Sequence, residues 1–479
     1  GAALGLALAA AGVRAITAAA GGLLPRSTEV HFDWRVVLFV GGTVVLTTLL
    51  FGLVPALQAA RGNLQAALRD GGREGSGGRG RSTFRNALVV AQFAVSLVLL
   101  AGAGLLLRTF AALLATDTGM RTEHALTMRV PLPVPSPRYP TPDAAVARFY
   151  APLLERVRAI PGVAGAGTIT KLPLQESGMN GNFTIGGKSY ATVSEEPFAE
   201  IRVVSPGYFA ALGIPVRGRD VAASDGGTGQ QVVLVNAELA RRYFPGEDPI
   251  GREIYFGRPS PTNPPNVIVG VVGSVRQSAL DRPPDPELYA PYSQAGPLGV
   301  SEVSLVVRTA GDPARFAGPV RAAVRAVDPL QPVFNVRTMR DVVRASVGDR
   351  RLYLGLLGAF AGVALALAVA GIYGVISYSV AQRTREFGIR LALGSEVGRM
   401  QRLVVWHGAR LALLGLAVGV PAAFLATRVL ERVLYGVTAS DPLTFAAAAL
   451  LLTAVSVLAS YLPARRVARV DPIVAMRAE

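Results

Sequence analysis

The chain reads Arg383-Thr-Arg-Glu-Phe-Gly-Ile-Arg-Leu-Ala-Leu-Gly394 between two long apolar runs. This stretch is too short and too charged to be a further membrane span. At the 100° spacing of an α-helix, Arg383, Glu386 and Arg390 fall on one narrow stripe, and Glu386 and Arg390 have the favourable i,i+4 order. The sequence therefore predicts a short, mostly apolar helix that ends at Gly394, with Ser395 capping the next helix.

Two interpretations fit this predicted helix. One is an ordinary positive loop that sets membrane topology, and the other is a docking element for another protein. We favour the docking element. Phe387 and Leu391 share one side of the helix, and Ile389 and Leu393 share the opposite side. We expect one pair to pack on the membrane helices and the other on the partner, and the sequence leaves open which pair does which.

Composition indicates a membrane protein with a sizeable aqueous part. Of the 479 residues, 51% are hydrophobic and only 17% are charged. The net charge is +16, but many arginines flank apolar runs, so membrane anchoring explains them better than nucleic-acid binding does. The chain has no cysteine, which excludes disulfides and thiolate metal sites. Because it begins inside an apolar run without Met, we expect it to be the C-terminal part of a longer protein.

Six apolar segments are long enough to be membrane helices: 1–24, 36–60, 87–107, 352–380, 403–430 and 443–462. The short segments 61–86 and 381–402 and the C-terminal tail are all rich in arginine. The positive-inside rule places all three in the cytoplasm, and alternation through six spans then places 114–350 outside.

The segment 114–350 has the pattern of an α/β domain. Strands are predicted at 125–130, 163–170, 303–308 and 333–336, and helices at 143–160 and 313–327, which gives two βαβ-like units. The material at about 175–290 has short strands, such as 232–235 and 267–272, between turn clusters. We therefore expect an α/β layer with an inserted, more β-rich subdomain.

The beginning and the end of the chain resemble each other. Leu53-Val-Pro-Ala-Leu-Gln-Ala-Ala-Arg61 matches Tyr461-Leu-Pro-Ala-Arg-Arg-Val-Ala-Arg469 in register. This repeat predicts a duplicated module, of which the chain keeps the last two spans of the first copy and all of the second.

Along the second module, the predicted order is one span, a large outside domain and three further spans. The 383–394 motif follows the first of those three spans. The outside domain also carries the phrases Ile160-Pro-Gly-Val163 and Val269-Gly-Val-Val-Gly273. Together these features resemble the MacB/FtsX family of ABC transporter permeases, in its double-module form. The resemblance implies a membrane complex that is dimeric, or pseudo-dimeric through a second permease module in the same chain, and is driven by an ABC ATPase. No ATPase precedes the module here, so the ATPase is expected on a separate chain.

The resemblance also assigns parts. It implies a truncated first module at 1–60, a cytoplasmic linker at 61–86, a membrane helix at 87–113, a MacB-like periplasmic core domain at 114–350 and an FtsX-like permease domain at 351–479. Segment 383–394 would be the coupling helix. The residues that would dock on the ATPase are Arg385, Glu386, Phe387, Gly388, Ile389, Arg390, Leu391, Ala392, Leu393 and Gly394.

The family implies a bacterial inner-membrane protein that exports or extracts a substrate at the outer face. Two alternatives stay open: a signalling protein that activates envelope enzymes through a partner there, and a membrane-anchored scaffold without an ATPase.

The sequence predicts no catalytic, cofactor or metal site. Gly187-Lys188-Ser189 lacks the first glycine of a phosphate-binding loop, because Asn182 stands in its place. The histidines are widely separated, and the aspartates at 225, 248, 281 and 285 are interpreted as loop carboxylates. Two pairs with Gly-x3-Gly spacing are candidates for close helix packing: Gly358 with Gly362, and Gly415 with Gly419.

Overall fold

The computed structural model describes residues 34–49, 77–175, 178–226, 229–261, 263–294, 296–383 and 395–467, together with 11, 14, 386, 387, 389, 390 and 393. The chain divides into two compact units. The helical unit combines Gly1–Ala112 with Gly348–Glu479, and the α/β unit is Leu113–Val347.

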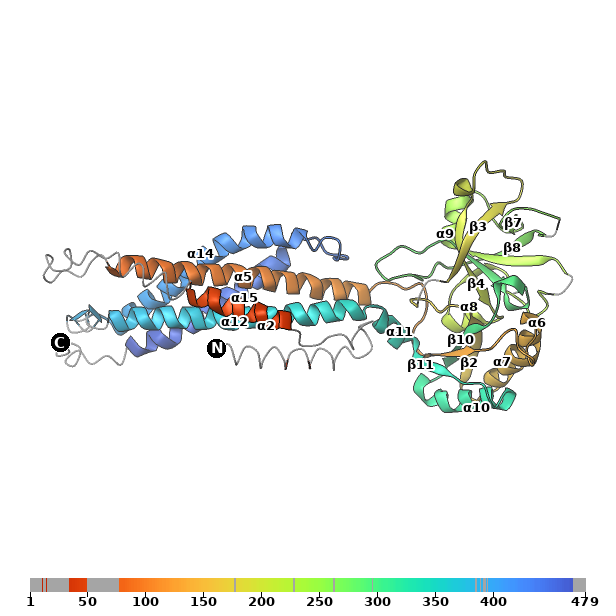
Figure 1. Cartoon of the computed structure of the whole chain (residues 1–479), viewed down its shortest axis with the longest axis horizontal. Helices are drawn as coiled ribbons and strands as arrows, with labels where there is room; N and C mark the ends of the chain where they lie inside the picture. The colour runs from red at the N-terminus through yellow and green to blue at the C-terminus, as the bar shows by residue number, and fades with distance from the viewer. Residues whose placement is uncertain are drawn as a thin grey trace. The chain divides into compact units, whose positions relative to one another are not determined.

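Four long apolar helices form the helical unit (Figure 1). They are α5 (Gly77–Leu114), α12 (Gly348–Gln382), α14 (Val397–Arg428) and α15 (Pro442–Val467). Each contains a stretch long and apolar enough to cross a membrane, so four of the six predicted spans are found among the described residues. The apolar helix α2 (Trp34–Thr48) falls in the second predicted span but is shorter, and the first predicted span lies outside the described residues except for positions 11 and 14.

The core of the helical unit draws side chains from all four long helices. Phe93 of α5, Ile372 of α12, Leu411 of α14 and Leu452 of α15 are buried in one cluster. Between α5 and α12, the Ser96 hydroxyl donates to the Ala364 carbonyl over 3.0 Å. The helices are thus held by interdigitated side chains and by polar contacts that satisfy small hydroxyl groups inside an apolar unit.

The two glycine pairs have different surroundings. A Cβ atom at Gly415 would lie 2.4 Å from Cβ of Phe93, and one at Gly419 would lie 3.0 Å from Cα of Ala94. These glycines therefore let α14 approach α5 closely. Around Gly358 and Gly362 no described atom comes within 4 Å of a Cβ position, so within the described part of the chain this pair does not make the predicted contact.

The α/β unit contains a four-stranded antiparallel layer in the order β11-β1-β10-β2. Its strands are β1 (Ala125–Pro131), β2 (Val163–Ile169), β10 (Glu302–Thr309) and β11 (Phe334–Thr338), close to the four predicted strands. β1 and β2 run parallel with β10 between them, and β10 and β11 run parallel with β1 between them. The two predicted βαβ-like units are therefore split and interleaved.

Helical segments connect the strands of each split unit. Between β1 and β2 lie α6 (Pro142–Ala145), the π-helical η3 (Val146–Tyr150) and α7 (Ala151–Arg158). Between β10 and β11 lie η7 (Pro313–Phe316) and α10 (Ala317–Val327). Side chains of both connections, including Phe149, Leu153 and Val324, are buried against alternate residues of the sheet, such as Met128 and Leu305. After β11, α11 (Met339–Ser346) begins with a capping box between Thr338 and Asp341.

The chain between β2 and β10 forms a ring of strands. Each strand pairs with the next in the order β4-β3-β7-β8-β6-β9, and β9 pairs back to β4. The strands are β3 (Met179–Ile185), β4 (Phe198–Val204), β6 (Gln231–Asn236), β7 (Glu253–Phe256), β8 (Asn266–Val272) and β9 (Glu287–Pro291), with β5 (Val216–Gly218) paired to β8. Short helices α8 (Tyr208–Leu212) and α9 (Ala237–Tyr243) lie within the same stretch. Closure leaves this subdomain with few open strand edges, and the pair Ile169 and Val204 joins β2 to β4.

Candidate functional site

The segment between α12 and α14 is helical where it is described. The Phe387 amide donates to the Arg383 carbonyl over 2.9 Å, and the Leu393 amide donates to the Ile389 carbonyl over 3.0 Å, both with helical i to i−4 spacing. The predicted i,i+4 ion pair is present, with Arg390 Nη2 2.5 Å from Glu386 Oε1. Half of the candidate docking residues lie outside the described part: Arg385, Gly388, Leu391, Ala392 and Gly394.

The apolar residues of this segment face different environments. Phe387 is 2% exposed and belongs to the core cluster of the helical unit. Ile389 is 44% exposed and Leu393 is 81% exposed. The side of the helix that carries Phe387 therefore packs on the membrane helices, which the sequence left open, and the exposed apolar pair, Ile389 and Leu393, is free for contact with another molecule.

A small cavity of about 140 Å³ lies beside Phe387. We call it the arginine cavity, because Arg383, which directly follows α12, and Arg410 from α14 both line it. Trp406 and His407 contribute one turn of α14 to its wall, so the cavity joins the docking segment to two membrane helices.

The start of α14 differs from the prediction. Its N-cap is Glu396, which has extended backbone angles and makes no side-chain cap hydrogen bond. The predicted cap Ser395 instead donates its amide to the Arg390 carbonyl over 2.9 Å, so its backbone still closes the preceding turn. Ser395 is thus the end of one helical segment and not the beginning of the next.

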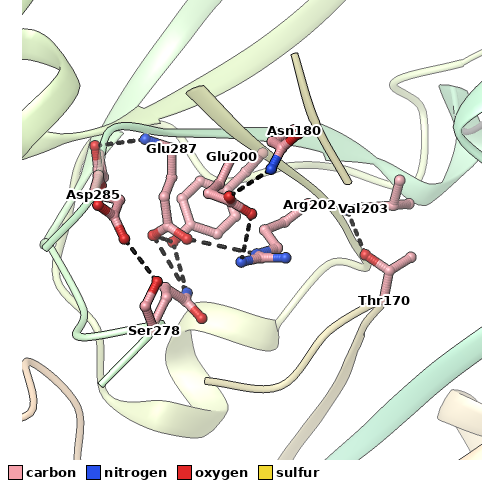
Figure 2. A network of polar contacts seen from close by, with 11 residues as sticks. Thr170, Asn180, Glu200, Arg202, Val203, Ser278, Asp285 and Glu287 are labelled. Carbon is pink, nitrogen blue, oxygen red and sulfur yellow. Dashed lines mark hydrogen bonds and ion pairs between the residues drawn. The ribbon is translucent and has the colours of Figure 1, made fainter. Parts of the chain in front are cut away.

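In the α/β unit, a buried polar network joins β4 to β9 (Figure 2). Arg202 of β4 points toward two carboxylates, and its guanidinium nitrogens lie 3.1 Å from Glu200 Oε2 and 3.6 Å from Glu287 Oε1. Tyr289 donates its hydroxyl to Glu287 Oε2 over 2.6 Å. Gln277 donates to the same oxygen over 3.3 Å.

Burial dominates the electrostatics of this network. The side chain of Glu287 is 0% exposed and that of Arg202 is 4% exposed. Burial raises the pKa of Glu287 to about 7, against the opposing effects of Arg202, Tyr289 and Gln277. Glu287 Oε1 and the Arg202 Nε and Nη1 atoms accept or donate no hydrogen bond within the described chain. The network is therefore a costly polar core whose charged form is only partly compensated.

Nothing in the sequence singled out Arg202 and Glu287, since both lie in strands of ordinary composition and meet only through ring closure. Three of the loop aspartates have local partners that the structure shows. Asp225 and Asp248 pair with Arg219 and Arg217, and Asp285 accepts from the Ser278 hydroxyl over 2.8 Å. No cluster of metal-binding side chains occurs among the described residues.

Two family models match the chain. One covers α5 and most of the α/β unit, and the other covers the rest of the helical unit's long helices. The MacB-like periplasmic core domain matches residues 87–327, and the FtsX-like permease C-terminal domain matches residues 358–472. The chain belongs to the MacB/FtsX family of ABC transporter permeases. In this family order, α5 leads into the periplasmic core domain, and α12, α14 and α15 make up the FtsX-like permease domain.

Curated relatives of this MacB/FtsX permease are distant. It is 23% identical to the uncharacterized ABC transporter permease YknZ of Bacillus subtilis (strain 168), over 71% of this chain and 86% of YknZ. It is 26% identical to the pyoverdine export ATP-binding/permease protein PvdT of Pseudomonas aeruginosa, over 52% of this chain and 37% of PvdT. The macrolide export ATP-binding/permease protein MacB of Marinobacter nauticus is 23% identical over 61% of this chain. The chain spans less than half the length of these two export proteins, 37% and 46%.

Solved structures of periplasmic regions are also similar. The periplasmic region of MacB from Actinobacillus actinomycetemcomitans has a TM-score of 0.32 and 16% identity, and covers 48% of this chain and 94% of that one. The extracellular domain of YknZ has a TM-score of 0.29 and 15% identity, and covers 44% of this chain and all of that one, 100%.

Proposed function

We propose that this permease receives motion from a separate ABC ATPase and transmits it through its membrane helices to the α/β unit, which exports or extracts a substrate at the outer face. The observation that carries the proposal is the asymmetry of the segment after α12. Phe387 is buried in the helical core, while Ile389 and Leu393 stay exposed. A partner that pushes on the exposed pair would therefore push directly on the packed membrane helices.

The proposed topology places this segment in the cytoplasm of a bacterium and the α/β unit outside the inner membrane. Support comes from the family that matches residues 87–327, which is described as periplasmic, and from the arginines that surround the segment 383–402. The docking surface then comprises Arg385 to Gly394, with Glu386 and Arg390 bordering the exposed pair.

A second module is the proposed partner within the membrane, either from the same chain or from a second copy. A Cβ atom at Gly358 or Gly362 of α12 would meet no described atom of another element within 4 Å, although small residues at this spacing favour close helix contact. The face that carries them is available for that module.

The docking proposal is tested by co-purification of the tagged, full-length chain from its own organism. We expect an ABC ATPase, recognised by its phosphate-binding loop, to co-purify with the unmodified chain. Leu393→Asp or Glu386→Lys should reduce its recovery about tenfold or more, which corresponds to a loss of about 1.4 kcal/mol in binding. The first substitution places a charge on an apolar contact, and the second reverses the charge that is paired with Arg390.

Leu330→Asp is the matched control, since Leu330 is 89% exposed and lies in the α/β unit. It should leave ATPase recovery unchanged. Equal recovery with all variants would overturn docking at this segment. Transport of cargo into inverted vesicles supports export, whereas ATP-dependent stimulation of an envelope hydrolase without transport would replace export by signalling.

A further inference from the structure

The arginine cavity brings two arginines together beside helices that are predicted to lie in the membrane. Arg410 lies one helical turn beyond Trp406 on α14, inside a stretch that is apolar enough to cross a membrane. A charged side chain at such a depth is costly unless it has a partner or reaches the interface. Neither Arg410 nor Arg383 makes a side-chain hydrogen bond or ion pair with any described residue.

The cavity has room for one small anionic group between these arginines. Its volume of about 140 Å³ is below the roughly 300–1,000 Å³ of sites that hold drug-sized ligands. The Ser379 hydroxyl and the His407 ring add polar groups to the wall. Arginine guanidinium groups bind phosphate with two parallel hydrogen bonds, so a phosphodiester suits this arrangement.

The chemistry of the wall favours one kind of phosphate. Among the described residues that line the cavity there is no Asp or Glu, so no carboxylate of theirs balances the ammonium group of a zwitterionic headgroup. The one acidic residue in the sequence of the docking segment, Glu386, is already paired with Arg390. Trp406, 64% exposed, and Leu403, 40% exposed, present an aromatic and an aliphatic surface beside the opening, as expected where acyl chains begin.

We infer that the arginine cavity binds the headgroup of an anionic phospholipid from the leaflet on the side of the docking segment. Phe387 forms part of the same wall, so a bound headgroup braces the segment that carries Ile389 and Leu393. The assignment of the leaflet to the cytoplasm rests on the proposed topology, but lipid binding itself does not depend on an ATPase.

The chain contains only two tryptophans, which makes a direct test simple. Trp34→Phe leaves Trp406 as the sole tryptophan, and it lies in the wall of the cavity. The chain of residues 1–479 with this substitution is reconstituted in phosphatidylcholine nanodiscs that contain a minor fraction of acyl-brominated lipid, either phosphatidylglycerol or phosphatidylcholine. Bromine quenches tryptophan fluorescence only at short range, so the quenching reports which lipid sits next to the cavity.

We expect brominated phosphatidylglycerol to be enriched beside Trp406 over brominated phosphatidylcholine by roughly fivefold for each arginine that contacts it. Arg383→Gln with Arg410→Gln should abolish the preference, and added inorganic phosphate should not. Arg402→Gln, an exposed arginine of the same helix outside the cavity, should keep it.

Equal quenching of Trp406 by the two lipids in Trp34→Phe, whose cavity residues are unsubstituted, would overturn the inference. So would an equal loss of preference in Arg402→Gln, because that result means general surface attraction. Competition by inorganic phosphate would identify the ligand as a free anion and would also overturn it. Since the readout needs no ATPase, failure here leaves the docking proposal intact, and failure of docking leaves the lipid site intact.

Discussion

The polar network of the α/β unit and the docking segment of the helical unit place side chains in opposite environments. Arg202 and Glu287 are charged side chains buried in the interior of their unit. Ile389 and Leu393 are apolar side chains left outside theirs. The partners that the first arrangement has lie within the chain, whereas the second is incomplete without another molecule. Substitutions in the first region should therefore act on the isolated chain, and substitutions in the second should act only when a partner is present.

The largest expected effect concerns the buried side of this comparison. The pKa of Glu287 is raised to about 7 from an ordinary value of 4.5. Between these values the folded state holds a proton that the unfolded state has lost, so the free energy of unfolding falls as pH rises. From about pH 5 to pH 8 the free energy of unfolding should fall by roughly 3 kcal/mol, because each unit of pKa difference between the folded and unfolded states corresponds to about 1.36 kcal/mol.

Urea unfolding of residues 113–347, which contain their own cores, measures this slope at several pH values. Glu287→Gln keeps the shape of the side chain but cannot titrate, so the slope should flatten. If the free energy of unfolding of Glu287→Gln kept the same dependence on pH, that dependence would come from other groups. The buried carboxyl group of Glu287 would then not be its cause.

A smaller effect on stability should distinguish the two glycine pairs of the helical unit. Gly415→Ala would place Cβ 2.4 Å from Cβ of Phe93, and such overpacking costs about 1–3 kcal/mol. Gly358→Ala meets no described atom within 4 Å and should leave the stability of the single chain unchanged. Thermal unfolding of the two variants in detergent compares identical substitutions in helices of similar composition. An equal decrease in melting temperature for both variants would contradict the conclusion that Gly415 is tightly packed and Gly358 is not.

Local patterns predicted most elements of the fold. The short apolar runs at 232–235 and 267–272 predicted β6 and β8, and the helix predicted at 313–327 covers η7 and α10. The long apolar runs likewise predicted α5, α12, α14 and α15. These features depend on residues close together in the chain, so they are visible in the sequence.

Other features depend on partners distant in the sequence. The two Gly-x3-Gly pairs are alike in sequence, and only the position of Phe93 on another helix distinguishes Gly415 from Gly358. Likewise, the closure of β4 against β9 brings Arg202 to Glu287, and no spacing rule relates these positions. At the docking segment the sequence predicted two apolar faces, and the burial of Phe387 beside the exposure of Ile389 and Leu393 was needed to tell which side is free.

The central claim is that the exposed face of the 386–393 segment contacts an ATPase while its buried face contacts the membrane helices. Because the 479 residues contain no cysteine, Leu393→Cys and Phe387→Cys each place a single thiol in this chain. Both variants are treated in native membranes with a short thiol-to-amine cross-linker, and the products are identified by mass spectrometry. We predict that Leu393→Cys cross-links to a protein with an ABC ATPase phosphate-binding loop and that Phe387→Cys does not. Cross-linking of Phe387→Cys alone, or of neither variant to such an ATPase, would contradict the claim.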